Sequence, residues 1–216
     1  MQLQAPSYLM ELIGQGEGLQ LDFKFAINDS RKIAISLSAF ANTKGGRLLI
    51  GVKDNGRIAG VRSDEEFYMI EAANEMYLNR PLPLTVIEHE QEGRIVLEVI
   101  VPEDQKKGIK AIDAHNKGWA YIRHFDQNIL ASPVHLEYWR YAADTEPKKR
   151  LNQQQIIQSL RIISSFEEGI SLENFQRRSN IQRKQATELL ARFLYWNLIK
   201  THIVNGRILF IGTECD

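Results

Sequence analysis

Apolar and polar residues follow clear periods along the first two thirds of the chain. Residues 19–25 alternate strictly, which predicts a strand with one covered face and puts Asp22 and Lys24 together on its uncovered face. Apolar residues recur at helical spacing over residues 29–43, and residues 48–52 are apolar on both faces. This succession predicts a helix followed by a central strand.

Capping and turn signals place the other elements of this part. Ser63 and Glu66 have the spacing of a capping box, and Ser132 precedes a proline suited to a first helical position. The predicted elements are a helix at 7–14, a turn at 54–56 leading into a strand at 57–61, a helix from 63 to about 79, a hairpin of residues 84–90 and 94–101, a strand at 119–123, and a last helix of this domain from 132. Together they predict an α+β domain with a mostly antiparallel or mixed sheet.

The last third of the chain has a different order of elements. Asn180 is expected to cap the third of three helices, and Asn205-Gly206 is a strong signal for a two-residue hairpin turn. The predicted elements are helices at 151–166, 171–177 and 181–196, followed by strands at 198–204 and 207–211. Three helices and a two-stranded wing are typical of a winged helix-turn-helix.

Charge and composition divide the chain near the polar stretch 144–150, which contains Pro147 and is interpreted as a linker. Residues 1–147 carry 16 Lys and Arg against 21 Asp and Glu, whereas residues 148–216 carry 11 against 6. The net charge of zero is therefore the sum of an acidic N-terminal part and a basic C-terminal part. We expect two domains, 1–144 and 151–216, with the second facing an anion.

Composition excludes several classes of protein. A single cysteine, Cys215, rules out an internal disulfide and a cysteine-based zinc site, and the five histidines show no metal-binding spacing. No apolar run is long enough to span a bilayer, and no secretory signal is visible at the N-terminus. We therefore expect a cytoplasmic protein without membrane partners.

Gly45-Gly46 raises the question of a phosphate-binding loop. A P-loop requires Gly-x-x-x-x-Gly-Lys-Ser/Thr between a strand and a helix, whereas this pair follows a helix and precedes a strand. The carboxyl end of a helix carries partial negative charge and does not attract phosphate. Gly45 is better explained as the left-handed residue that ends the helix.

Three carboxylates form a candidate metal site. Glu17 precedes the first strand, Asp22 lies on its uncovered face, and Asp54 lies in the turn after the central strand. If the two strands are neighbours, the three side chains could converge on a divalent cation, which would activate water in a nuclease. The alternative is that Glu17 and Asp22 are solvated charges and that Asp54 only forms the turn.

Basic residues suggest two surfaces for nucleic acid. A recognition helix reads the major groove with its N-terminal residues while neighbouring side chains hold phosphates, and the alternative for this segment is a solvated helix face. In the second domain, the candidates for base edges are Gln182, Arg183 and Gln185, and those for the backbone are Arg177, Arg178 and Lys184. In the first domain, Lys24, Lys44, Arg47 and Arg123 could form a groove for the backbone.

The first domain resembles the Schlafen-like Alba-type domain, also labelled a "divergent AAA" or DNA-binding domain. The matching pieces are EGLQLDFK, ISLSAFANTKGGRLLIGVKDNG and IAGV, together with the later GWAYIRHFDQNILAS. The resemblance covers roughly residues 10–140. Bacterial proteins of this kind often carry a C-terminal helix-turn-helix and are described as transcriptional regulators, in agreement with the winged helix expected here. Such proteins are also labelled as ATP-binding, but this sequence contains no Walker motif.

The resemblance also implies a second activity. In animal Schlafen nucleases, related domains use three acidic residues to cut transfer RNA, and by motif Glu17, Asp22 and Asp54 fall on those positions. Asp22 stands where the family has a glutamate, which puts the metal geometry in doubt. Those enzymes pair two such lobes, so this chain would need to form a homodimer to build an equivalent groove.

The sequence favours a DNA-binding transcriptional regulator that acts as a homodimer, with DNA favoured over RNA as its partner and no cofactor. The alternative is a metal-dependent endoribonuclease of Schlafen type that uses Glu17, Asp22 and Asp54 with Mg²⁺ or Mn²⁺. A third hypothesis is an interaction module whose wing contacts protein. An ATPase is disfavoured.

Overall fold

The computed structural model describes residues 7–61, 64–144 and 151–213. The chain divides into two compact units, Met1–Leu130 and Ala131–Asp216, which we call the first unit and the second unit.

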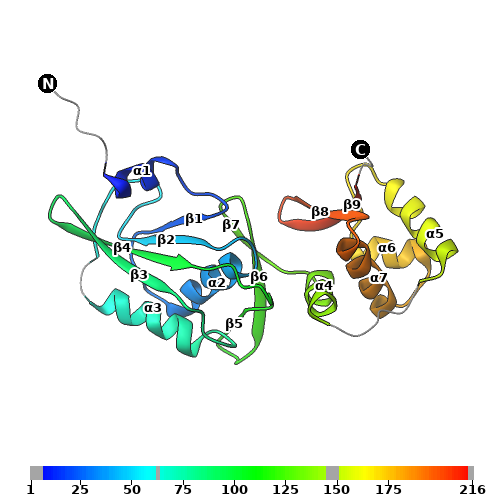
Figure 1. Ribbon diagram of the computed structural model, residues 1–216, viewed down its shortest axis with the longest axis horizontal. Coiled ribbons are helices and arrows are strands. Elements are labelled where there is room, and N and C mark those ends of the chain that lie inside the picture. Colours follow the sequence, from blue (N-terminus) through cyan, green and yellow to red (C-terminus); the bar gives the residue numbers. More distant parts are fainter. Residues whose placement is uncertain (1–6, 62–63, 145–150, 214–216) are drawn as a thin grey trace, which may run out of the picture. The chain divides into compact units, whose positions relative to one another are not determined.

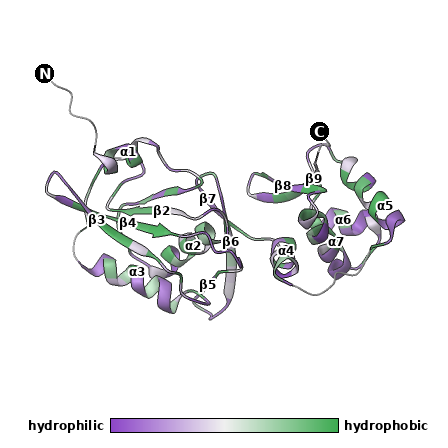
Figure 2. Ribbon diagram, in the orientation of Figure 1, coloured by the Kyte–Doolittle hydropathy of each residue, from purple (hydrophilic) through white to green (hydrophobic). Residues whose placement is uncertain are grey.

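A four-stranded mixed sheet forms the centre of the first unit (Figure 1). Its strand order is β1 (Leu21–Lys24), β2 (Gly46–Ile50), β4 (Arg94–Val101) and β3 (Thr85–Gln91). Strand β1 runs parallel to β2, and the other pairs are antiparallel. The predicted mixed sheet is confirmed, and β2 lies in its interior as its unbroken apolar run indicates (Figure 2).

The two faces of the sheet are covered by different helices. On one face, Leu49 packs in a cluster with α1 (Tyr8–Gly14). On the other face, Leu48 packs in a larger cluster with α2 (Ser30–Ala41) and α3 (Glu65–Met76). Successive residues of β2 thus pack in different apolar clusters on the two faces of the sheet, because side chains alternate across a strand.

A second, three-stranded sheet packs on α2. It consists of β5 (Lys110–Ile112), β6 (Gly118–His124) and β7 (Gln127–Leu130). Asn42, the residue that ends α2, donates from Nδ2 to the carbonyl oxygens of Ile109 and Tyr121 at 2.8 and 2.9 Å. Only β6 is predicted from the sequence, because β5 and β7 are too short to show a period.

The double glycine connects α2 to β2 as a turn. Gly45 has a φ of +65°, and its N–H donates to the Phe40 carbonyl at 2.9 Å. A Cβ at Gly45 would lie 2.7 Å from the carbonyl oxygen of Val101, so the turn also needs glycine for space. The predicted left-handed conformation of Gly45 is confirmed, but α2 itself ends at Ala41 with Asn42 as its C-cap residue, three residues before Gly45.

Two predicted details of the first unit have a different outcome. Residues 57–61 form no strand, because Val52 and Ile58 make only an isolated bridge. Helix α3 begins at Glu65, and Ser63 of the predicted capping box lies outside the described residues. The β3–β4 hairpin is confirmed, with Glu92 and Gly93 at φ values of 52° and 70°.

The second unit contains four helices and one hairpin among its described residues. Its apolar core joins all four helices to the hairpin. Asn205 and Gly206 both have positive φ, which confirms the predicted turn. The elements are α4 (Pro133–Ala143), α5 (Gln153–Ser164), α6 (Leu172–Ser179), α7 (Arg183–Tyr195), β8 (Ile199–Val204) and β9 (Arg207–Gly212).

Helix α4 corrects the predicted domain boundary. Its start is as expected, because Ser132 accepts a hydrogen bond from the His135 N–H and Pro133 occupies the first turn. The helix nevertheless packs in the second core, where Val134 is fully buried. The compact units therefore divide after residue 130, whereas the sequence predicts domains of 1–144 and 151–216. The polar stretch within 144–150 separates two helices of one unit.

The turn between α6 and α7 also differs from the prediction. Asn180 adopts the left-handed conformation, with a φ of 52°, and ends α6. Helix α7 has Gln182 as its N-cap residue. Asparagine suits both roles, since it tolerates positive φ and also caps helix starts, and the sequence alone does not decide between them.

Candidate functional site

The acidic trio is only partly brought together. Glu17 accepts a hydrogen bond from the Phe23 N–H at 2.8 Å. Burial raises the pKa of Glu17, and the neighbouring Asp22 carboxylate raises it further, whereas the Phe23 N–H and Lys24 lower it. Asp54 lies exposed in the turn that follows β2.

Asp22 is a buried, ion-paired side chain. Only 3% of the residue is exposed, and its carboxylate lies 3.1 Å from Arg123 Nη2 and 2.7 Å from Lys24 Nζ. The prediction of an uncovered face for Asp22 is wrong, because Arg123 of β6 covers that side of β1. Two cations already balance this carboxylate.

The described residues contain no group of three or more His, Cys, Asp or Glu side chains placed to hold a metal ion. Glu17, Asp22 and Asp54 are all among the described residues, so the structure does not assemble them as a metal site.

Arg123 is an internal side chain of the first unit. Its guanidinium is 1% exposed and donates to the carbonyl oxygens of Gly18 and Leu21 and to the side chains of Asp22 and Asn128. The predicted role of Arg123 in a surface groove for nucleic acid is therefore wrong, since these four acceptors use its donors inside the protein.

The other three predicted cations of the first unit differ in their surroundings. Lys24 pairs with Asp22, and Arg47 Nε lies 2.8 Å from the carboxylate of Glu98, which is fully buried. Lys44 is exposed. A phosphate that approached Lys24 or Arg47 would have to compete with a buried carboxylate.

In the second unit, the predicted nucleic-acid residues lie at the end of α6 and the beginning of α7. All six are exposed: Arg177, Arg178, Gln182, Arg183, Lys184 and Gln185. The structure brings them together across the turn that contains Asn180, because three residues separate the two helices.

Local contacts orient some of these side chains. Arg177 donates to the Asn174 carboxamide oxygen at 2.6 Å, and its distance to Glu173 is 4.0 Å. Arg178 lies over the ring of Phe166. Gln185 Oε1 accepts from the backbone N–H of Gln182 at 3.4 Å, which supports the start of α7.

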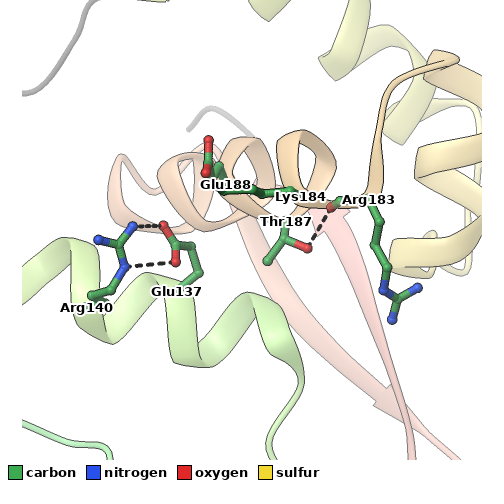
Figure 3. Close-up of a pocket in the computed structure, with 6 residues that line it drawn as sticks. All are labelled: Glu137, Arg140, Arg183, Lys184, Thr187 and Glu188. Atoms are coloured by element: carbon green, nitrogen blue, oxygen red, sulfur yellow. Dashed lines mark hydrogen bonds and ion pairs between the residues drawn. The ribbon is translucent and has the colours of Figure 1, made fainter.

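A groove of about 600 Å³ runs between α4 and the start of α7 (Figure 3). Glu137 and Arg140 of α4 pair with each other through two hydrogen bonds. Arg183 extends away from this pair, and no ion pair is found for Arg183 or Lys184 among the described residues. The Glu137 charge is therefore balanced within α4.

Three further basic residues of the second unit were not predicted as site residues. Lys200 and Arg207 are exposed on the β8–β9 hairpin, and the position of Arg207 directly after Asn205-Gly206 is a sequence signal for the tip. Arg140 reaches the α4–α7 groove only through the packing of α4, for which the sequence gives no signal.

None of the helices in the described parts of the chain combines the length and apolar character needed to cross a bilayer.

Two solved structures show partial similarity to this chain. The DIP2311 protein from Corynebacterium diphtheriae is 18% identical with a TM-score of 0.44, and the match covers 66% of this chain but only 29% of that protein. The N-terminal domain of a RecG-related protein from Nitrosomonas europaea is 19% identical with a TM-score of 0.45, and the match covers 70% of this chain and 97% of that domain. No curated protein sequence matches this chain.

The sequence itself matches a described family over most of the first unit. Residues 17–132 correspond to the family described as Schlafen, AlbA_2. The matched segment contains the whole mixed sheet, the double-glycine turn and the Asp22–Arg123 pair. Because it spans more than half of the 216 residues, this protein belongs to the Schlafen, AlbA_2 family.

Proposed function

We propose that this protein binds nucleic acid through its second unit, in which α5, α6, α7 and the β8–β9 hairpin act as a winged helix on duplex DNA. In this proposal α7 enters the major groove, and the hairpin lies along the backbone as the wing. Duplex DNA is favoured over duplex RNA because the major groove of B-form DNA admits a helix, whereas that of A-form RNA is too narrow.

One observation carries this proposal: four cations converge, exposed, on the α6–α7 turn. Arg177, Arg178, Arg183 and Lys184 are exposed. Among the described residues, the one carboxylate paired with any of them is that of Glu173, which lies 4.0 Å from Arg177 in a pair whose side chains are 72% and 70% exposed. Exposed pairs of this kind are weak, so these cations are available to phosphates at little energetic cost.

The cations of the first unit support the assignment of DNA binding to the second unit, because three of them are already paired within the protein. Arg123 is buried, and Lys24 and Arg47 are paired with the buried carboxylates of Asp22 and Glu98. These cations stabilise the fold of the first unit. We therefore assign the affinity for DNA to the second unit.

A binding assay with matched charge reversals tests the proposal. The variant Arg183→Glu/Lys184→Glu is compared with Lys32→Glu/Lys106→Glu, since Lys32 and Lys106 are exposed in the first unit and no ion pair is found for either among the described residues. Both variants change the net charge equally. Fluorescence anisotropy with labelled random-sequence duplex DNA, and with duplex RNA in parallel, gives the dissociation constants.

The expected loss follows from two charge-assisted contacts. Each is worth about 1.5 kcal/mol, so their removal weakens DNA binding by roughly a hundred-fold. The control variant should bind within about two-fold of the wild type. An equal loss in the two variants, or tighter binding to RNA than to DNA, would contradict the assignment of α7 to the DNA groove.

We propose further that the protein regulates transcription as a homodimer, with two copies of α7 on two half-sites. A single recognition helix covers few base pairs, and a dimer doubles the contacts and imposes a palindromic site. Selection of binding sequences from a random duplex pool should then yield inverted repeats. Recovery of single, unrepeated motifs would contradict the dimer.

A further inference from the structure

A second surface, on the first unit, differs in chemistry from the α6–α7 turn. A groove of about 580 Å³ lies between α3 and the segment that leads into β3. Phe67 of α3 and the side chains of Leu84 and Val86 give it an apolar lining. Glu71 and Glu75 of α3 also line it, and both are exposed.

Strand β3 beside this groove is an open edge. It is the last strand in the order β1-β2-β4-β3, and no further strand pairs with it among the described residues. All seven of its residues are in register with β4. Edge strands are often protected by bulges, prolines or lysines, and Thr85–Gln91 contains none of these.

The hairpin fixes which backbone groups face outward. In a two-residue hairpin the closing pair, here Gln91 and Arg94, exchanges backbone hydrogen bonds, and every second pair along the ladder does the same. The intervening residues Val86, Glu88 and Glu90 therefore direct their N–H and C=O groups toward the open edge. Their side chains share the face of the sheet that α3 covers.

The charge of this region has one sign. Neither α3 nor β3 contains a lysine or arginine, as their sequences EEFYMIEAANEM and TVIEHEQ show. Glu71, Glu75, Glu88 and Glu90 are exposed, and no ion pair is found for any of the four within the described part of the chain. The region repels nucleic acid and attracts a cationic partner.

The same charges disfavour a second copy of the chain as the occupant. Pairing of β3 with its own copy would bring Glu88 and Glu90 of both chains together across one ladder, and like charges that face each other there are destabilising. The open edge, the apolar groove and the four carboxylates are compatible with one kind of partner strand.

We infer that the α3–β3 groove binds an extended basic peptide segment of a partner protein, which adds as a strand to the edge of β3. Its backbone pairs with the outward groups of Val86, Glu88 and Glu90. Its α3-facing side chains are apolar beside Val86 and Leu84, and are lysine or arginine where they meet the glutamates. Its other side chains lie beside Ile87, which is 38% exposed, and are apolar.

Three labelled, capped heptapeptides test this inference on the full-length protein by fluorescence anisotropy. One alternates lysine with valine, a second alternates lysine with proline, and a third alternates glutamate with valine. The lysine–valine peptide should bind in the micromolar range. The lysine–proline peptide has the same charge, but proline fixes φ near −65° and holds the backbone away from the β conformation, so this peptide should bind at least about tenfold more weakly. The glutamate–valine peptide should not bind.

Protein variants separate strand addition from simple charge attraction. Glu88→Pro removes an outward N–H and leaves the β3–β4 ladder intact, because proline is tolerated on an edge strand where its nitrogen faces solvent. Glu88→Ala removes only the charge. Glu88→Pro should abolish binding of the lysine–valine peptide, whereas Glu88→Ala should weaken it by a few-fold. Glu71→Lys/Glu75→Lys should also abolish it.

Several results would overturn the inference. These are equal affinity for the lysine–valine and lysine–proline peptides, unchanged binding by Glu88→Pro with an unaltered unfolding midpoint, or no binding by the wild type. A wild-type dimer that Glu88→Pro converts to monomer would assign the edge to a second copy instead. DNA affinity should be the same in Glu88→Pro and Glu88→Ala, so the outcome is independent of the proposed function.

Discussion

Replacement of Arg123 tests whether this side chain holds the first unit together or contacts a ligand. The guanidinium joins β6 to β1 through the carbonyl oxygens of Gly18 and Leu21 and the carboxylate of Asp22. The variant Arg123→Met keeps much of the side-chain volume but removes the charge and every donor of the guanidinium. It leaves Asp22 buried with Lys24 as its remaining cationic partner.

The magnitude follows from the burial of this pair. Loss of one partner of a buried ion pair costs about 3–5 kcal/mol. Because Lys24 remains 2.7 Å from Asp22, we expect the lower end, about 3 kcal/mol of unfolding free energy. For a unit of this size such a loss lowers the melting temperature by roughly 10 °C. Lys44→Met, at an exposed position, should change the unfolding free energy by less than about 0.5 kcal/mol.

Urea denaturation followed by circular dichroism measures these effects, and a double-mutant cycle with Asp22→Asn assigns them. If the two side chains act as a pair, Asp22→Asn/Arg123→Met should lose less stability than the sum of the single losses. Loss of DNA affinity in Arg123→Met with unchanged stability would refute this reasoning, since Arg123 would then be a ligand contact.

Three further predictions concern acid sensitivity, the turn and metal. Burial lowers the pKa of His135 to about 4, so on acidification this side chain is protonated in the unfolded chain before it is protonated in the folded protein. Acidification from pH 6.5 to pH 4 should therefore lower the unfolding free energy of the wild type by about 3 kcal/mol. The variant His135→Gln should not show this loss. Gly45→Ala should lower the unfolding free energy by at least about 1–3 kcal/mol, because the φ of +65° disfavours alanine and its Cβ would clash with the carbonyl oxygen of Val101. An unchanged midpoint in urea denaturation would contradict this prediction. Millimolar Mn²⁺ should induce no cleavage of structured RNA, and cleavage that both Glu17→Ala and Asp54→Ala abolish would establish the nuclease alternative.

The features predicted correctly from the sequence depend on local chemistry. Gly45 and Asn205-Gly206 mark turns because their backbone conformations are open to few other residues. The exposure of Arg183 and Lys184 follows from their place at the start of an amphipathic helix.

The features predicted incorrectly depend on contacts between distant segments. Asp22 occupies a polar position in an alternating strand, and nothing near it reveals that Arg123, 101 residues further along, covers it. Likewise, Ser132 and Pro133 mark the start of α4, but only the burial of Val134 shows that α4 belongs to the second unit. The structure does not bring the acidic trio together among the described residues, and motif spacing does not report that Asp22 is already paired with Arg123 and Lys24.

The salt dependence of DNA binding tests the central claim most directly. The slope of log K against log salt concentration counts the phosphates that the protein neutralises, at about 0.9 per phosphate. Arg183→Ala/Lys184→Ala should reduce the magnitude of this slope by about 1.8, and Lys32→Ala/Lys106→Ala should leave it unchanged. An unchanged slope in the first variant, or an equal reduction in both, would contradict the assignment of DNA binding to the start of α7.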